Sequence, residues 1–287
     1  MPEGGVVLGK IDLHLHSTAS DGRLSPRTLV LKAVELGLTA IALADHDSVD
    51  GVEEALQAAA AFPGLRVIPA VEISTDTPEG EVHILGYCLD YHDAALKEAL
   101  KRFRESRVKR AEAIVSKLAR LGVHVDWSRV KELAGAGSIG RPHIAQAMLE
   151  KGYIASLREA FNRYISQGGP AYVEREKMTP AEAVRLVTTA RGLPVLAHPF
   201  TVNDPEAMVA SLRPAGLVGL EAYYGNSTPE SIERMAALAR KFDLVPTGGS
   251  DYHGLDSDSE PMMGSVDVPP ESVERLLALA RQRGRPG

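Results

Sequence analysis

Short apolar runs alternate along the chain with longer stretches in which apolar residues recur every three or four positions. Seven runs of four to six residues predict strands, at Ile11–His14, Ala40–Ala44, Arg66–Val71, Val82–Tyr87, Pro194–Ala197, Val218–Ala222 and Leu244–Gly248. Several of these runs are apolar throughout, which is typical of strands buried on both faces. Strands that alternate with helices are usually parallel, so the pattern predicts an α/β fold in which helices cover a parallel sheet or barrel.

Capping residues mark the helices between these strands. Ser25, Thr179 and Thr228 each precede a proline and predict N-caps, and Ser48 predicts the start of a further helix. Glu182 completes a capping box with Thr179. Glycines stand where four helices are expected to end, at Gly37, Gly122, Gly152 and Gly192.

One connection interrupts the alternation. Residues 94–172 contain no convincing strand, although a connection between a strand and a helix normally takes only a few residues. Four helices are expected there, at Ala94–Leu121, after Asp126, at Pro142–Lys151 and at Leu157–Gln167. We therefore expect residues 94–172 to be inserted as an all-helical subdomain into a sheet or barrel built from residues 1–93 and 173–287.

Composition narrows the class of protein. The chain has 287 residues, 44% of them hydrophobic and 24% charged, which is typical of a folded globular protein. Its single cysteine excludes an internal disulfide. No apolar run approaches the ~18 residues of a membrane helix, and the first residues lack the pattern of a signal peptide. These features favour a cytoplasmic protein without a membrane partner.

The net charge of -6 hides a division within the chain. Residues 94–172 contain fifteen Lys and Arg against seven Asp and Glu, so the insertion carries +8 and the remainder -14. A basic helical cap suits a small anionic substrate. Aromatic residues make up only 5% of the chain and form no platform for long single strands. Binding of duplex DNA is not expected.

Histidines and carboxylates gather at the ends of the predicted strands. Nearly all of them lie at or just beyond the carboxyl end of a strand, where the residues of a parallel barrel meet at one rim. The candidate metal ligands are His14, His16, Asp21, His46, Glu72, His83, His198, Asp251 and His253. Only His83 departs from the rule, because it stands early in its strand.

A lone histidine near a strand end is usually an ordinary hydrogen-bonded side chain, and we interpret His92 and His124 in that way. The convergence of six of the nine histidines with carboxylates instead indicates metal binding. Imidazole and carboxylate groups are ligands for zinc, manganese and iron, and nine of them exceed the needs of one ion. The sequence therefore predicts two or three divalent ions, with Glu72 and Asp251 balancing their charge.

These residues resemble the motifs of the PHP (polymerase and histidinol phosphatase) superfamily of metal-dependent phosphoesterases. The resemblance lies in His14-x-His16, Asp45-His46-Asp47, Glu72 with His83, Ala197-His198-Pro199 and Ser250-Asp251-Tyr252-His253. It is closest to a stand-alone bacterial branch similar to 3',5'-nucleotide bisphosphate phosphatases and 5'-3' exonucleases on short RNA, and the stretch Gly137–His143 also looks like that branch. It implies a distorted (β/α)7 TIM-like barrel, in agreement with the seven strands.

The resemblance also implies how the ligands group. One ion would be held by His14, His16, Glu72 and Asp251, a second by Glu72, His83 and His198, and a third by Asp21, His46 and His253. Glu72 would bridge the first two ions. Where Asp21 stands, many members have histidine, so a third site with this carboxylate is harder in character.

Clustered divalent ions beside a phosphate favour hydrolysis. We expect a phosphatase or 5'-3' exonuclease in which a metal-bridging water, held by Glu72 and its partner ligands, attacks phosphorus to release phosphate from a nucleotide or a short RNA. Two alternatives remain open, a histidinol phosphatase and a catalytically inactive metal-binding regulatory module.

The substrate contacts are expected in the insertion and just after it. Arg141 and His143 flank a proline in a loop that contains glycine, which is a rigid place from which to direct a guanidinium at phosphate. We expect both to bind substrate, with His143 also a candidate general acid and Lys177 a further candidate. The lone thiol, Cys88, ends a predicted strand and is expected to pack rather than react.

Overall fold

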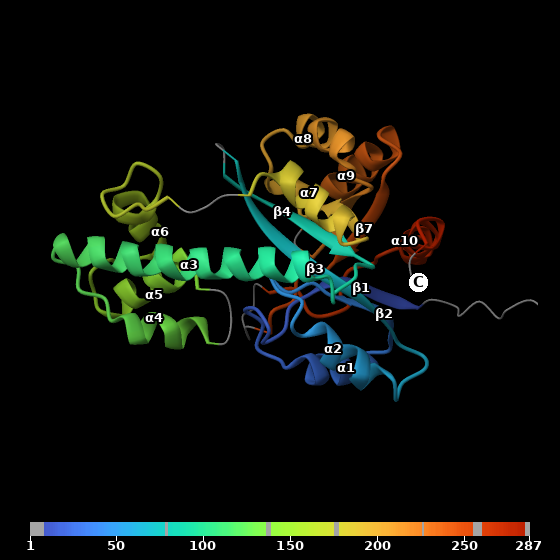
Figure 1. Cartoon of the computed structure of the whole chain (residues 1–287), viewed down its shortest axis with the longest axis horizontal. Coiled ribbons are helices and arrows are strands. Elements are labelled where there is room, and N and C mark those ends of the chain that lie inside the picture. Colours follow the sequence, from blue (N-terminus) through green and yellow to red (C-terminus); the bar gives the residue numbers. More distant parts are fainter. Residues whose placement is uncertain are drawn as a thin grey trace, which may run out of the picture. The chain divides into compact units, whose positions relative to one another are not determined.

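The computed structural model describes residues 9–77, 80–135, 139–174, 178–225, 227–254 and 260–284. Its backbone contacts divide into two compact units. One unit takes the residues up to Glu98 together with those from Met178 onward, and the other takes Ala99–Lys177. Helix α3 (Ala94–Arg120) begins at the end of the first unit and continues into the second (Figure 1).

The first unit is a nearly closed barrel of seven strands that neighbour one another in chain order. The strands are β1 (Lys10–Leu15), β2 (Leu38–Leu43), β3 (Arg66–Thr77), β4 (Gly80–Tyr87), β5 (Leu193–Leu196), β6 (Gly219–Tyr224) and β7 (Val245–Gly249). A backbone hydrogen bond from His16, just after β1, to Tyr252, just after β7, links these two strands at the carboxyl end of the barrel. All seven strands predicted from the sequence are confirmed.

The direction of β4 corrects the expectation of a wholly parallel sheet. β4 pairs antiparallel with both β3 and β5, whereas the other neighbouring strands are parallel. β3 and β4 are too close in sequence for the crossover that a parallel pair needs. The reversal explains His83, because the early residues of β4 lie at the same barrel end as the late residues of its neighbours. His83 is in register with Ser74, two residues beyond Glu72.

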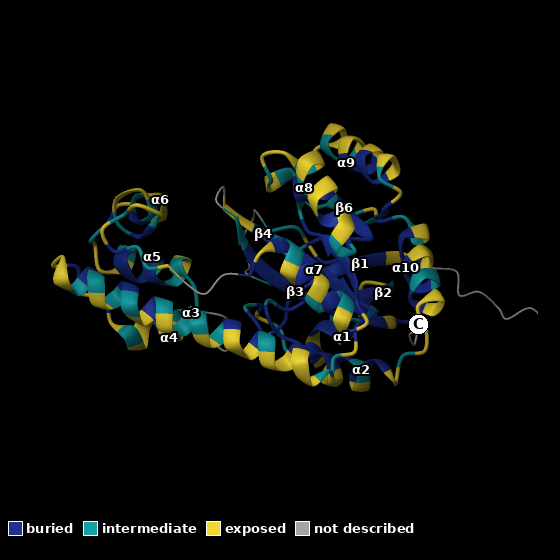
Figure 2. Ribbon diagram, turned by 45° about the horizontal axis from the view of Figure 1, so that its top comes forward, coloured by how far each residue is buried: buried dark blue, intermediate teal, exposed yellow. Residues whose placement is uncertain are grey.

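Helices surround the barrel (Figure 2). They are α1 (Pro26–Glu35), α2 (Val52–Ala59), α7 (Pro180–Thr189), α8 (Pro205–Leu212), α9 (Pro229–Lys241) and α10 (Pro270–Gln282). Leu276 and Leu277 of α10 pack in one apolar cluster with residues from the start of the parallel strands, such as Ile11, Ala40 and Ile68. α10 therefore covers the amino end of the barrel and leaves the carboxyl ends of the strands for the site.

Most of the expected helix boundaries hold. Ser25, Thr179 and Thr228 cap their helices as predicted, and Thr179 forms the capping box with Glu182. Ser48 does not cap α2, which begins at Val52, because its hydroxyl accepts a hydrogen bond from the backbone of Asp50 instead.

The expected helix-end glycines hold at three positions of four. Gly37, Gly122 and Gly152 take positive φ angles. At the fourth position Arg191, rather than Gly192, takes the positive φ. A Cβ at Gly192 would lie 2.7 Å from a methyl group of Val187, so close packing requires this glycine.

The second unit is all-helical. It contains most of α3 and α4 (Trp127–Ala134), α5 (Arg141–Glu150) and α6 (Leu157–Ala160), the last continued by a π-helical turn at Phe161–Ile165. Ile114 and Leu118 of α3 share a buried core with Val130 of α4 and with Ile144 and Met148 of α5. Across the described parts of the chain, no helix has the length and apolar character of a membrane span.

Candidate metal centre

The first barrel strand delivers two imidazoles to the carboxyl end of the barrel. His14 lies in β1 and His16 directly follows it, and the spacing of two places both side chains on one side of the strand. Both rings are fully buried. All nine candidate ligands fall within the first unit, and contacts of 3.8 Å or less between side-chain atoms join them into one network.

Glu72, a buried residue of β3, stands at the centre of this network. Its Oε2 lies 3.3 Å from His14 Nε2 and 3.4 Å from His16 Nε2, and 3.0 Å from His46 Nδ1. Its Oε1 lies 2.8 Å from His83 Nδ1 and 3.1 Å from His198 Nε2. The two oxygens of one carboxylate therefore face two different sets of histidine nitrogens.

Asp251 completes the set around His14 and His16. It follows β7, and its Oδ1 lies 3.0 Å from His16 Nε2 and 3.5 Å from His14 Nε2. Its other oxygen, Oδ2, accepts a 2.8 Å hydrogen bond from the Tyr224 hydroxyl. The donor atoms of His14, His16, Glu72 and Asp251 lie within 4.8 Å of one another, which is close enough for one ion.

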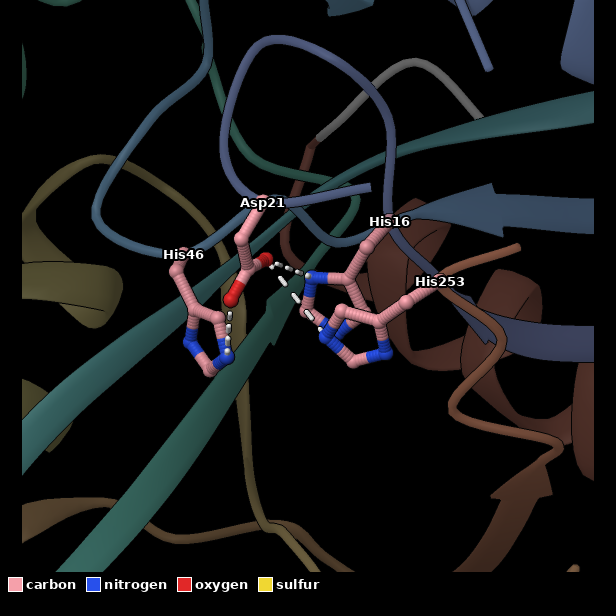
Figure 3. Close-up of side chains that lie close together, drawn as sticks. All are labelled: His16, Asp21, His46 and His253. Atoms are coloured by element: carbon pink, nitrogen blue, oxygen red, sulfur yellow. Dashed lines mark ion pairs between the residues drawn. The ribbon is translucent and has the colours of Figure 1, made fainter. Parts of the chain in front are cut away.

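A further set gathers around Asp21, in the loop between β1 and α1. Figure 3 shows its carboxylate between His46 on one side and the rings of His16 and His253 on the other. Oδ1 lies 3.4 Å from His253 Nε2 and 3.8 Å from His16 Nδ1, and Oδ2 lies 3.8 Å from His46 Nε2. His46 also lies within reach of Glu72 and His83, so the sets share members.

The donor atoms fit a divalent metal. His14 Nε2, both ring nitrogens of His16, Glu72 Oε2 and Asp251 Oδ1 are buried, and none has a hydrogen-bond partner among the residues that the structure describes. Buried polar atoms normally have partners, because an unsatisfied one costs ~1–3 kcal/mol. Nitrogen and oxygen atoms that converge in this way instead suit a cation, and their mixture suits zinc, manganese or iron.

The protonation of these groups reflects burial and their neighbours. Burial disfavours the charged form of His14, but Glu221, Asp251 and Glu72 outweigh it and raise the pKa of His14 well above its ordinary value. Burial, reinforced by His253 and His46, lowers the pKa of His16 to about 4. A neutral His16 has a lone pair available for a metal near neutral pH.

The buried carboxylates of the centre stay ionised. Burial alone would raise the pKa of Glu72, but the imidazoles of His46, His83 and His14 hold it well below its ordinary value. Asp251 behaves in the same way, because His14 and His16 outweigh burial and lower its pKa. Charged carboxylates are the form that binds a cation.

Three buried carboxylates that support the centre were missed in the sequence. Asp12 accepts hydrogen bonds from the backbone and hydroxyl of Ser250, which tie β1 to the segment that carries Asp251. Asp45 accepts from Ser17 and Ser20 and so fixes the loop that carries Asp21. Glu221 contacts His14 and the backbone of His198. An isolated acidic residue inside an apolar strand is the signal that marks Glu221.

Three of the six described non-glycine residues with positive φ angles lie at the centre. His198 and Asp251, which both carry candidate donor atoms, have positive φ angles of 25° and 56°, and Asp47 beside His46 has 48°. Such conformations cost non-glycine residues about 1–3 kcal/mol, and they persist where the surrounding structure enforces them. The local hydrogen bonds of the barrel rim therefore stabilise an orientation that the chain would not otherwise adopt.

The predicted substrate residues belong to the second unit. Arg141 and His143 lie in the first turn of α5. The Arg141 guanidinium lies over the ring of Phe161, 5.7 Å from its centre, and His143 Nδ1 accepts a 3.1 Å hydrogen bond from the backbone of Gly140. Lys177 lies outside the described residues. A substrate contact by any of the three stays a prediction.

Comparison with known proteins gives consistent matches. The sequence profile of the PHP domain matches residues 12–156. A 5'-3' exoribonuclease from Haemophilus influenzae is 34% identical over 248 residues, which span 85% of this chain and 90% of that protein. A 3',5'-nucleoside bisphosphate phosphatase from Chromobacterium violaceum is 30% identical over 273 residues, 92% of this chain and 94% of that protein.

A solved structure from Bifidobacterium adolescentis, described as a metal-dependent phosphoesterase, superposes with a TM-score of 0.79. It is 29% identical in sequence, and the match covers 93% of this chain and 95% of that one. The likeness therefore extends over both units of the chain.

Proposed function

The chain belongs to the PHP domain family and is a metal-dependent phosphoesterase, and from this premise we propose that it hydrolyses phosphate monoesters of nucleotides. Its substrates would be 3',5'-bisphosphonucleotides, the 5' ends of short oligoribonucleotides, or both. The relatives that act on a nucleoside bisphosphate and on RNA support this class. The excess of positive charge in residues 94–172 favours the same anionic substrates.

One observation carries the proposal. The two oxygens of Glu72 face separate sets of histidine nitrogens, at 2.8–3.4 Å. Such a carboxylate would hold two ions side by side, with Asp251 as a second anionic ligand of one of them. Divalent ions bound there would activate water as the nucleophile and neutralise the charge on the phosphate oxygens.

The protein's own groups would hold and orient these ions. Buried imidazoles at His14 and His16 exclude solvent from one side of the centre, which strengthens its electrostatic interactions. Asp21, with His46 and His253, would hold a third ion or a phosphate-bridging cation at the more exposed edge. Manganese, zinc and iron all match this mixture of donors.

A panel of phosphate-release assays tests the substrate class. Manganese-loaded protein would be compared on a 3',5'-bisphosphonucleotide, a 5'-phosphorylated dinucleotide, a cyclic phosphodiester and histidinol phosphate, with His14→Ala as the inactive control. We expect turnover of one or both nucleotide substrates at least tenfold faster than of histidinol phosphate. Preference for histidinol phosphate, or turnover of none, would contradict the proposal; the latter would favour a metal-binding module.

We further propose that the inserted helices supply substrate contacts through Arg141 and His143. A guanidinium binds phosphate with two parallel hydrogen bonds, so Arg141→Ala is expected to raise KM by about 10-fold, the equivalent of ~1.4 kcal/mol. Arg158→Ala is the matched control, because Arg158 is an exposed arginine of the same unit. Equal KM values for the two variants would remove Arg141 from the substrate site.

A further inference from the structure

Glu221 is a fully buried carboxylate in β6, and each of its oxygens has a different partner. Oε1 lies 2.9 Å from His14 Nδ1, and Oε2 accepts a 2.7 Å hydrogen bond from the backbone N–H of His198. His14 lies in β1 and His198 follows β5, so one side chain connects two separate parts of the metal centre. The Glu221 side chain is shielded from solvent, because its exposed fraction is 0%.

The contact with His14 determines which ring nitrogen faces the centre. With Nδ1–H donating to Glu221 Oε1, Nε2 is the ring nitrogen through which His14 would bind a metal ion. That atom lies 3.3 Å from Glu72 Oε2 and 3.5 Å from Asp251 Oδ1, in the set whose donor atoms fit one ion.

The contact with His198 holds a strained backbone. His198 has a φ of 25°, which is unfavourable for a side chain with a Cβ. The hydrogen bond from the His198 N–H to Glu221 Oε2 stabilises this conformation. The His198 ring consequently lies with Nε2 3.1 Å from Glu72 Oε1, whereas His14 Nε2 faces the other oxygen of Glu72.

We infer that Glu221 is a positioning residue for two metal positions at once, because it orients the His14 ring and fixes the His198 backbone from a single carboxylate. The inference rests on the proposed metal centre but not on its substrate. Supporting carboxylates of this kind orient metal-bound histidines, and their loss typically weakens metal binding 10–100-fold.

Glu221→Gln tests the inference with almost no change in shape. The amide has one accepting oxygen and one NH₂ group that only donates, so it satisfies either His14 Nδ1–H or the His198 N–H and opposes the other, whichever way it turns. The contact that remains is made to an amide oxygen, a weaker acceptor than a carboxylate oxygen. We therefore expect the dissociation constants of both manganese ions, measured by calorimetry, to increase, and that at the opposed position to increase at least tenfold. Weakening of one ion alone, or of neither, would overturn the link between the two positions.

Glu182→Gln is the matched control. Glu182 accepts hydrogen bonds from the backbone and hydroxyl of Thr179 in a capping box and contacts no candidate ligand. Its replacement is expected to leave both dissociation constants unchanged. If Glu221→Gln weakens both ions while no substrate is hydrolysed by the wild-type protein, the proposed function fails and the role of Glu221 stands.

A spectroscopic measurement on wild-type protein keeps the inference testable should the variant fail to fold. In zinc-loaded protein labelled with ¹⁵N-histidine, His14 is expected to show a protonated Nδ1 that is protected from exchange and a metal-bound Nε2. A purely structural role of Glu221 does not require this pattern. Coordination of zinc through His14 Nδ1 would overturn the inference.

Discussion

Replacing Glu72 by glutamine removes the charge that faces five histidine nitrogens and leaves the side chain almost the same size. One amide oxygen still accepts, but the NH₂ group then faces either the set around His14 and His16 or the set around His83 and His198. One side of the centre therefore loses its contact with an oxygen of residue 72 completely, and the other keeps only a neutral oxygen at that position.

The expected size of the effect follows from these contacts. Two charge-assisted contacts are lost or weakened, each worth ~1.5–3 kcal/mol, so the loss amounts to about 3–6 kcal/mol. That corresponds to a decrease in metal affinity of roughly 10²–10⁴-fold. We expect Glu72→Gln to lose bound manganese during gel filtration and to lose phosphatase activity in parallel.

Metal content by mass spectrometry and phosphate release would be measured on the same preparation. Glu53→Gln serves as the control, because Glu53 accepts hydrogen bonds from Gln57 and Tyr91 on the exposed surface. A thermal unfolding curve distinguishes metal loss from unfolding. Full metal content and undiminished activity in a folded Glu72→Gln protein would refute the central position of this carboxylate.

Three further expectations follow from the same geometry. Tyr224→Phe removes the hydrogen bond to Asp251 Oδ2 and should weaken manganese binding about 10-fold, since a hydrogen bond to a charged group is worth ~1.5–3 kcal/mol. Tyr223→Phe is the control, and equal manganese affinities of the two variants would exclude a role of this hydrogen bond in metal binding. Removal of manganese by a chelator should lower the melting temperature of the protein, because a free ion concentration of 100 times the dissociation constant stabilises the fold by ~2.7 kcal/mol. An unchanged melting temperature would contradict this expectation. Nearby carboxylates outweigh burial and raise the pKa of His14, His198 and His253, so these rings keep protons in the metal-free protein. Because a metal ion must displace these protons, manganese affinity should rise from about pH 6 to pH 8, with proton release measured by calorimetry. A manganese affinity independent of pH would count against this expectation.

The positions of the candidate ligands were predictable because strand ends converge in a barrel. His14, His16 and Asp251 required only the strand assignments and the alternation of side chains along a strand. The structure brings all nine residues together as that reasoning requires. Their grouping came from the family resemblance, and the geometry adds that His46 and His16 belong to more than one set.

Strand direction was harder to infer than strand position. The interval between Arg66–Val71 and Val82–Tyr87 is too short for a helical crossover, and this signal for an antiparallel pair lies in the sequence. The apolar pattern itself carries no information on direction, because a buried strand shows the same run of residues whether it is parallel or antiparallel to its neighbours. The early position of His83 was the observable consequence.

Supporting residues lie beyond what pattern reasoning reaches. Glu221 is a single acidic residue in an apolar strand, and its partners His14 and His198 are distant in sequence. Only the folded barrel brings the Glu221 side chain within reach of both. The hydrogen bond from Tyr224 to Asp251 has the same origin, since it joins a strand to the loop that follows its neighbour.

The most direct test of a metal-dependent nucleotide phosphatase centred on Glu72 is the release of phosphate from a 3',5'-bisphosphonucleotide, with bound metal counted on the same sample. We predict at least two manganese ions per chain, turnover that disappears on chelation and returns with manganese, and no turnover by His14→Ala. Undiminished turnover by fully chelated protein, or by His14→Ala, would contradict this prediction.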